Sequence, residues 1–523
     1  LALTGQQGGW PLTMFLTPDG APFWGGTYFP PDSRWGRPGF PHVLAAIADT
    51  WRQEGEKVAG NVAALKRGLA RITEVAHGPP VTTALLDAVA DRLVKAFDPL
   101  QGGIGSAPKF PHCPVFELVL RAWLRTGEAG ARDAILTTVD HICNGGIFDH
   151  VGGGFARYST DAGWLVPHFE KMLYDNAQLV SLLTLAWQAT GRALYRERVY
   201  ETIAWVLREM IADDSGFASS LDADSDGEEG KFYVWTKDEI DRLLGPDAAL
   251  FDRVYDVSAD GNWEERTILH RNHPAASATP EEEHILARCR AILLDARAPR
   301  VRPGWDDKVL ADWNGLMIAS LAEAGFVFGE QRWIDAAKRA FDAVLAHESD
   351  GHLAHSWRKG KASAQGLLED YALMAGAALK LHEITGDNDY LAAAERWVAV
   401  ALSGAAAALP VSVPGFSVVV AVGCAADDLV NAIAARIPHV IVGPGDAPDS
   451  MMGPLITEAH RDRVRSYVEG ATDEGARVVV DGTASDLGEG FFLGCSLLDG
   501  VTPGMKVYDD EIFVPVVSVA RVS

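Results

Sequence analysis

The stretch PHFEKMLYDNAQL, residues 167–179, brings together side chains that could transfer protons. If it forms one helix, His168 and Asp175 share a face near the helix start, with Glu170 and Tyr174 on another. An imidazole exchanges protons near neutral pH, and two carboxyl groups can divide acid and base roles when their surroundings separate their pKa values. Such a set beside aromatic rings favours carbohydrate chemistry. The alternative is that His168 and Asp175 bond each other and only fix a buried turn.

Other loops supply further carboxylates and rings. Asp224 and Asp307 are additional carboxylates, and the candidate catalytic residues are His168, Glu170, Asp175, Asp222, Asp312, Glu369 and Asp370. Aromatic rings can stack on a pyranose, and an amide can bond its hydroxyls. The candidate substrate-binding residues are therefore Trp164, Tyr174, Trp235, Trp313, Asn314 and Tyr371.

The sequence predicts no metal site and no nucleotide fingerprint. In DADSDGEEG, Asp222, Asp224 and Asp226 take the first, third and fifth places of an EF-hand loop, but Tyr233 stands at the twelfth, where calcium needs a bidentate carboxylate. The glycine clusters lack the strand, spacing and helix of a dinucleotide or Walker site. The five cysteines are scattered without metal-ligand spacing, which favours a reducing compartment, and we expect a cytoplasmic protein.

Charge and hydropathy restrict the partners. The chain has 523 residues and a net charge of −25, which opposes binding to nucleic acid or anionic lipid. No charged residue occurs from Trp397 to Ala426, but Pro410, Pro414 and Gly415 interrupt that stretch, so we interpret it as a seam and not as a membrane span. A small, sugar-like molecule is the expected partner, and the oligomeric state stays open.

Three kinds of segment must position these groups. PLTMFL and APFWGGTYFP, joined by the turn TPDG, predict a β-hairpin. From about residue 40 to 400, apolar periodicity predicts helical hairpins with short strands such as KFYVW. Thr236 with Glu239 predicts a capping box at the start of one helix, which Gly245 ends. After Pro414, FSVVVAVG, HVIVG and ARVVVDG predict strands around the helix ADDLVNAIAARI.

The opening GGWPLTMFLTPDGAPFWGGTYFPP resembles the end of the thioredoxin-like domain in a family that includes spermatogenesis-associated proteins. GGIGSAPKFPHCP, GGIFDHVGGGFARYSTDAGWLVPHFEKMLYDNAQL, SSLDADSDGEEGKFYVW, DDKVLADWNGLMIASLAEAG and LLEDYALMAGAALKLHEITGD resemble the same family in the same order. The resemblance implies an (α/α)6 toroid like that of N-acylglucosamine epimerases and several glycosidases. It also implies that Pro11 matches the cis-proline of thioredoxins and that a CxxC pair precedes Leu1.

The last hundred residues, from NAIAARIPHVIVG to VYDDEIFVPVVSVARV, resemble CoA-acylating methylmalonate-semialdehyde dehydrogenase. The resemblance implies that Glu511 bonds the nicotinamide ribose and that Phe513 packs beside the nicotinamide, whereas Val514 replaces the usual glycine. The family's dinucleotide segment, general-base glutamate and nucleophilic cysteine lie upstream of the matching stretch, where this chain carries helical sequence. Without a thiolate no thiohemiacetal can form, so we expect no dehydrogenase turnover.

Together these features predict a mainly α protein. It comprises a truncated thioredoxin-like α/β piece with following helices (1–80), an incomplete (α/α)6 toroid (81–402), a seam (403–415) and a partial α/β aldehyde dehydrogenase segment (416–523). We expect no cofactor for the toroid, and NAD and CoA only for a complete dehydrogenase. The function hypotheses are carbohydrate binding or transformation in the toroid, NAD-dependent semialdehyde oxidation, and a non-catalytic chimeric or fragmentary chain.

Overall fold

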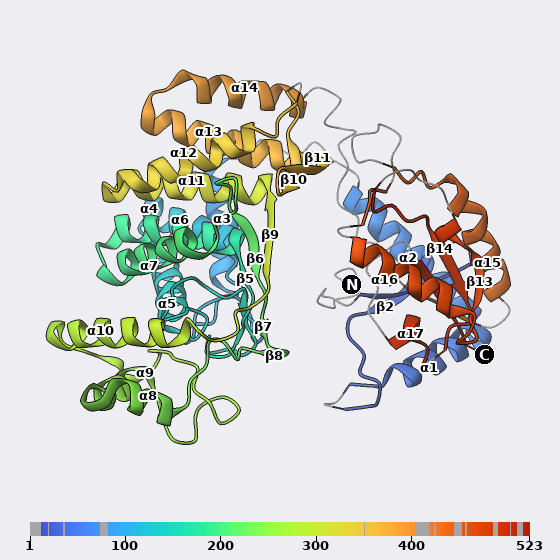
Figure 1. Ribbon diagram of the computed structural model, residues 1–523, viewed down its shortest axis with the longest axis horizontal. Helices are drawn as coiled ribbons and strands as arrows, with labels where there is room; N and C mark the ends of the chain where they lie inside the picture. The colour runs from blue at the N-terminus through green and yellow to red at the C-terminus, as the bar shows by residue number, and fades with distance from the viewer. Residues whose placement is uncertain are drawn as a thin grey trace. The chain divides into compact units, whose positions relative to one another are not determined.

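A computed structural model describes residues 12–18, 20–34, 37–73, 82–349, 351–402, 418–422, 425–443, 452–455, 458–484, 490–502, 504–509 and 516–522. It divides into two compact units (Figure 1). One unit contains residues Pro80–Val411, and the other contains Leu1–Pro79 together with Ser412–Ser523. The described residues are mainly helical, as the periodicity predicts.

The N-terminal hairpin forms as predicted. Strands β1 (Thr13–Leu16) and β2 (Pro22–Gly26) pair antiparallel, and Gly20 takes a φ of +80° in the turn between them. Helices α1 (Phe40–Gln53) and α2 (Gly55–Thr73) follow. Their apolar faces share a small core with the hairpin, made of Phe15, Phe23, Val43, Ile47 and Val58. Trp10 and Pro11 lie outside the described residues.

The C-terminal segment is α/β. Its sheet has the order β12-β15-β14-β13, from β12 (Val418–Val422), β13 (Arg477–Val480), β14 (Ser496–Asp499) and β15 (Val516–Val522). The pairs β12–β15 and β15–β14 are parallel, whereas β13 pairs antiparallel with β14. The helices of this segment are α15 (Ala425–Arg436), α16 (Glu458–Ala471) and α17 (Lys506–Asp509). HVIVG was wrongly predicted as a strand: Ile437–His439 form a 3-10 turn, and Val442 makes an isolated bridge to Met452.

The central unit is built from helical hairpins stacked side by side (Figure 1). After α3 (Thr83–Val94), the hairpins are α4 (Cys113–Thr126) with α5 (Ala129–Asn144), α6 (Leu173–Thr190) with α7 (Ala193–Glu209), α11 (Ala311–Phe328) with α12 (Gln331–Leu345), and α13 (Leu368–Thr385) with α14 (Asn388–Leu402). The first helix of each hairpin packs against the first helix of the next, α4 on α6, α6 on α11 and α11 on α13. These four form an inner layer, and α5, α7, α12 and α14 lie outside it. The described residues thus give four hairpins, and a six-hairpin toroid stays a prediction.

The inner helices begin in a repeated way. In each of α4, α6, α11 and α13, the fourth residue of the helix contacts a tight loop. For α4 this is the loop after α3, and for the other three it is the loop after the second helix of the preceding hairpin. Asn176 of α6 accepts from the backbone N–H of Phe155 at 2.7 Å and donates to its carbonyl at 3.0 Å. Asn314 of α11 likewise accepts from the backbone N–H of Phe217 at 2.8 Å and donates to its carbonyl at 3.0 Å. We call this pair the asparagine clamps, and they fix the start of each helix to the loop before it.

A five-stranded sheet adjoins the starts of these helices. Its order is β11-β10-β9-β6-β5, from β5 (Lys171–Met172), β6 (Ala218–Leu221), β9 (Trp305–Leu310), β10 (Ala354–Arg358) and β11 (Lys361–Gln365). Strand β5 leads directly into α6, β9 leads directly into α11, and β11 precedes α13. The amino ends of the inner helices and this sheet therefore share one end of the unit (Figure 1).

An excursion separates the two middle hairpins. It contains the short strands β7 (Asp224–Ser225) and β8 (Glu228–Glu229) and the helices α8 (Lys237–Leu244), α9 (Ala248–Tyr255) and α10 (Pro280–Arg297). The predicted capping box of Thr236 and Glu239 is present, and Gly245 follows the last residue of α8. The strand prediction for KFYVW was wrong, because residues 231–233 form a turn and only Trp235 makes a bridge, to Thr267.

Among the helices of the described residues, none is both long enough and apolar enough to cross a membrane.

Candidate functional site

His168 lies on a strand and not on a helix. It belongs to β4 (Pro167–His168), which pairs with β3 (Tyr158–Ser159), whereas α6 begins only at Leu173. The expectation that His168 and Asp175 share a helix face was therefore wrong, and so was the alternative that they bond each other. His168 Nδ1 lies 2.7 Å from Glu229 Oε1, and its ring stacks on Tyr158 with centroids 5.1 Å apart.

Glu170 lies between His168 and the start of α6 in the sequence and interacts with both. Its carboxylate accepts from Arg157 at 3.0 Å and lies 3.7 Å from His168 Nε2. The charges of Arg157 and Glu170 both reach Asp175 in the first turn of the helix. His168, Glu170, Arg157, Tyr174 and Asp175 form one group, which we call the α6 cluster.

Asp175 is the most unusual carboxyl group of the α6 cluster. The residue is only 7% exposed, and its Oδ2 has no hydrogen-bond partner. Burial raises the pKa of Asp175 to about 7, although the positive charge of Arg157 and a hydrogen bond with Tyr174 act in the opposite direction. A carboxyl group with this pKa can donate and accept a proton near neutral pH.

A second group gathers at the starts of α11 and α13. Asp370 is fully buried and accepts from the backbone N–H of Asp312 at 2.9 Å, while His355 Nδ1 lies 3.0 Å from its Oδ2. Burial and the charge of Asp370 raise the pKa of Asp312 to about 6. Burial would lower the pKa of His355, but the hydrogen bond and charge of Asp370 raise it. We call Asp312, His355 and Asp370 the α11/α13 cluster.

Aromatic contact joins the two clusters. The ring of Tyr174 meets the ring of Trp313 edge to face, with centroids 4.8 Å apart, and both side chains are half-buried. Glu369, beside Asp370, is exposed. The structure thus brings together six sequence-predicted residues at the starts of three neighbouring helices, namely Tyr174, Asp175, Asp312, Trp313, Glu369 and Asp370.

An open pocket of about 370 Å³ adjoins the α6 cluster. Its lining comes from the loop before β5 and from the facing ends of β6 and β9, and consists of Glu170, Ser220, Asp222, Gly304, Trp305 and Asp306. Trp305 is 43% exposed. The carboxylates of this pocket can accept hydrogen bonds from sugar hydroxyls, and the exposed indole can cover one apolar face of a sugar ring.

Four predicted substrate-binding residues offer no surface to a ligand. Trp164 and Asn314 are fully buried, and Trp235 and Tyr371 are 1% exposed. Each has a role in packing: Trp164 Nε1 donates to the carbonyl of Gln101, Asn314 forms its clamp, and the Tyr371 hydroxyl accepts from the N–H of Leu353. Trp235 belongs to the core of the excursion. Among the predicted rings, Tyr174 and Trp313 retain accessible surface.

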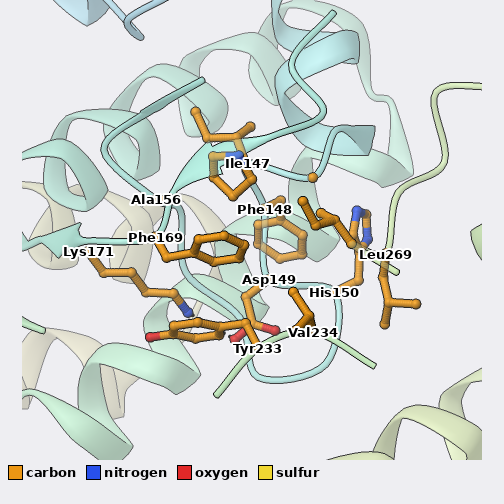
Figure 2. A pocket seen from close by; sticks show the side chains of 13 residues that line it. Ile147, Phe148, Asp149, His150, Ala156, Phe169, Lys171, Tyr233, Val234 and Leu269 are labelled. Carbon is orange, nitrogen blue, oxygen red and sulfur yellow. Dashed lines mark hydrogen bonds and ion pairs between the residues drawn. The ribbon is translucent and has the colours of Figure 1, made fainter. Parts of the chain in front are cut away.

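A second, smaller cavity lies nearby, lined mainly by apolar side chains and by Asp149, His150, Lys171 and Tyr233 (Figure 2). At about 30 Å³ it accommodates a water molecule but no sugar. Lys171 and Arg297 both bind Asp149 at 2.9 Å. Burial would raise the pKa of Asp149, but these two positive charges hold it well below its usual range. This network is internal and supports the fold beneath the site.

Three residues of the site, Arg157, Trp305 and His355, were not predicted from the sequence. Arg157 follows the glycine-rich loop, and Trp305 precedes the aspartates of β9. His355 has no signal of its own, because its partner Asp370 is 15 residues away. A recurring loop pattern could have shown the repeat: FDPLQGGIG, FDHVGGGF and IADDSGF each precede an inner helix.

Comparison with known proteins identifies relatives of both ends of the chain. Residues 1–70 match the family model Thioredox_DsbH, described as "Protein of unknown function, DUF255". Residues 415–523 match the Aldehyde dehydrogenase family. The two matched stretches lie at opposite ends of the chain and belong to two different family models.

Curated relatives show the same division. Human spermatogenesis-associated protein 20 is 32% identical over 440 residues, which covers 74% of this chain and 56% of the relative. Malonate-semialdehyde dehydrogenase 1 of Bacillus thuringiensis is 41% identical over 108 residues, covering 20% of this chain and 22% of the relative. The chain therefore spans about half the length of the former and about a fifth of the latter.

A solved structure resembles the chain over the same share. It is a putative methylmalonate-semialdehyde dehydrogenase from Sinorhizobium meliloti 1021 in complex with NAD, 35% identical over 20% of this chain and 23% of that chain. The TM-score is 0.20. Glu511 and Phe513, which the resemblance assigns to NAD, lie outside the described residues.

Proposed function

We propose that the starts of α6, α11 and α13 form a carbohydrate site, where Asp175 transfers a proton to or from a bound sugar. The observation that carries the proposal is Asp175 itself. It is a nearly buried carboxyl with one unpartnered oxygen and a pKa raised to about 7, next to two half-buried rings. Perturbed carboxyl groups of this kind gather at catalytic sites.

The neighbouring groups fit roles in such a reaction. Glu170 lines the open pocket and accepts from Arg157, and its carboxylate oxygens can accept hydrogen bonds from sugar hydroxyls. His168, held by Glu229 and Tyr158, lies close enough to Glu170 to take part in proton exchange. Tyr174 and Trp313 supply ring faces for an apolar side of the sugar. The reaction class is an epimerase- or glycosidase-like proton transfer, within the proposed toroid.

Ligand-dependent thermal unfolding tests this proposal. A panel of neutral and amino monosaccharides and disaccharides is added to the parent chain and to Asp175→Asn and His168→Ala. We expect at least one sugar to raise the melting temperature of the parent, with the shift lost in Asp175→Asn and reduced in His168→Ala. Gln178→Ala is a matched control, since Gln178 lies one turn further along α6 and donates only to the Tyr174 carbonyl. The absence of any sugar-dependent shift in the parent would refute the proposal.

The aldehyde dehydrogenase match supports a second candidate, NAD-dependent oxidation of a semialdehyde. We infer that the matched segment has no such activity by itself, because it covers only 22% of the dehydrogenase relative. A dehydrogenase of this kind needs a thiolate nucleophile, and the helical unit that precedes the matched segment contains the buried thiols of Cys113 and Cys143. Burial raises the pKa of both thiols, so neither is a ready thiolate nucleophile. NADH formation from methylmalonate semialdehyde, CoA and NAD is the test, and turnover by the purified chain would restore this candidate.

A further inference from the structure

We propose that the α11/α13 cluster of Asp312, His355 and Asp370 binds one divalent transition-metal ion. The three side chains come from different elements, the start of α11, strand β10 and the start of α13. Each can offer one ligand atom, and these atoms lie within 4.8 Å of one another. Convergence of an imidazole and two carboxylates from separate parts of the chain is the arrangement of a metal centre with open positions.

The charges of the cluster favour a cation. Among the described residues, no lysine or arginine forms an ion pair with Asp312 or Asp370. Lys308, whose charge acts on His355, forms an ion pair with Asp306 at 3.2 Å. Two carboxylates with only an imidazole between them repel each other, and a bound divalent ion would replace that repulsion with attraction.

The orientation of the side chains is already fixed. Asp370 accepts from the backbone N–H groups of Asp312 and Leu367, at 2.9 and 2.6 Å, so its carboxylate cannot rotate freely. Its contact with His355 Nδ1 holds the imidazole in place. A carboxylate has about four acceptor positions, so these hydrogen bonds leave room for a metal bond.

Ligand type limits the choice of metal. Magnesium and calcium prefer sites made wholly of oxygen atoms, whereas one imidazole with two carboxylates suits manganese, iron or zinc. Three protein ligands leave coordination positions for water or for sugar hydroxyls. Metal binding would keep Asp312 ionised, so Asp175 in the α6 cluster would remain the carboxyl that transfers protons.

Titration of metal-stripped full-length chain with MnCl₂ and ZnCl₂ by isothermal calorimetry tests the proposal without any sugar. We expect one ion per chain with a Kd below about 100 µM. Asp312→Asn and His355→Gln should each weaken binding by about tenfold or more, because even a lost outer partner of a metal ligand costs that much. Asp256→Asn is the matched control: Asp256 bonds His270 at 3.1 Å, in a pair that lacks a second carboxylate, so binding should not change.

A spectroscopic readout covers the case in which a variant does not fold. Electron spin-echo spectroscopy of the Mn²⁺-loaded parent should show coupling to one imidazole nitrogen. The proposal is overturned if the parent binds neither ion in that range, if Asp312→Asn and His355→Gln bind as tightly as the parent, or if the bound manganese shows no nitrogen coupling. None of these outcomes depends on carbohydrate binding, so failure of the metal site and failure of the proposed function can be told apart.

Discussion

The starts of α6 and α11 share a scaffold and differ in chemistry. Both have an asparagine at the fourth position with three hydrogen bonds: two to a phenylalanine backbone and one to the residue before the helix, Met172 or Leu310. Directly before the asparagine, α6 carries Tyr174 and Asp175, whereas α11 carries Asp312 and Trp313. The carboxyl and the ring have exchanged places between the two helices.

The difference shows which positions the fold constrains. The fourth position is buried in both helices, and its side chain must hydrogen-bond the backbone N–H and C=O of a buried loop residue. The position is therefore restricted to side chains that can form these hydrogen bonds. In α13 the same position is Tyr371, whose hydroxyl accepts from Leu353. The second and third positions face the shared end of the unit, and there the residue type varies with the chemistry. A repeated scaffold thereby carries a site that is not repeated.

The largest expected effect comes from breaking a clamp. Asn176→Ala and Asn314→Ala each remove three hydrogen bonds and leave a buried N–H and C=O without a partner, so each should lower the free energy of unfolding by about 2–4 kcal/mol. Chemical denaturation followed by tryptophan fluorescence measures the loss. If the clamps are equivalent, the two values should agree within about 1 kcal/mol. Gln178→Ala, which removes one hydrogen bond from a half-buried side chain, should cost less than either.

A pH-dependent effect of similar size is expected at one of the chemical positions, Asp175. Because the pKa of Asp175 is raised in the folded chain, its contribution to stability is fully present below about pH 4 and is lost as the pH rises through about 7. Asp175→Asn removes that loss, so the variant should exceed the parent in stability by up to about 4 kcal/mol at pH 8 and differ little at pH 4. Urea unfolding at both pH values measures this difference. Equal stability of the two chains at pH 8 would show that Asp175 is not destabilised by burial.

The smallest effect is expected at Glu369, which occupies the second position of α13. Its side chain is exposed, unlike the half-buried Tyr174 and Asp312 at the second positions of α6 and α11. Glu369→Gln should therefore change the free energy of unfolding by less than about 0.5 kcal/mol. A clearly larger change in the same urea titration would place Glu369 among the constrained residues and weaken the contrast between scaffold and chemistry.

Local patterns in the sequence predicted local structure well. The N-terminal hairpin, the capping box at Thr236 and the helical hairpins follow from turn residues, caps and periodicity, which act over a few residues. His168 shows the limit of such reasoning. Its spacing from Asp175 suits a helix, but pairing with Tyr158 places it on a strand, and a partner ten residues away has no trace in a local pattern.

The candidate site was predicted in part for the same reason. Asp175, Asp312 and Asp370 could be proposed because each lies near the start of an apolar periodic segment, but which of them meet depends on how the inner helices pack. Trp164, Trp235, Asn314 and Tyr371 were selected by residue type, yet burial decides whether a ring or an amide can reach a ligand. His355 could not be found, because only the pairing of β10 with its neighbouring strands brings it to Asp370.

The most direct test of the central claim is a carboxyl titration of the chain labelled with ¹³C at the aspartate side chains, followed by NMR from pH 4 to 9 and compared with Asp175→Asn. We expect one carboxyl signal that titrates near pH 7 in the parent and is missing from the variant. If the Asp175 signal instead titrates below about pH 5, in the ordinary range of aspartate, Asp175 is ionised at neutral pH and cannot be the proton-transferring group of this site.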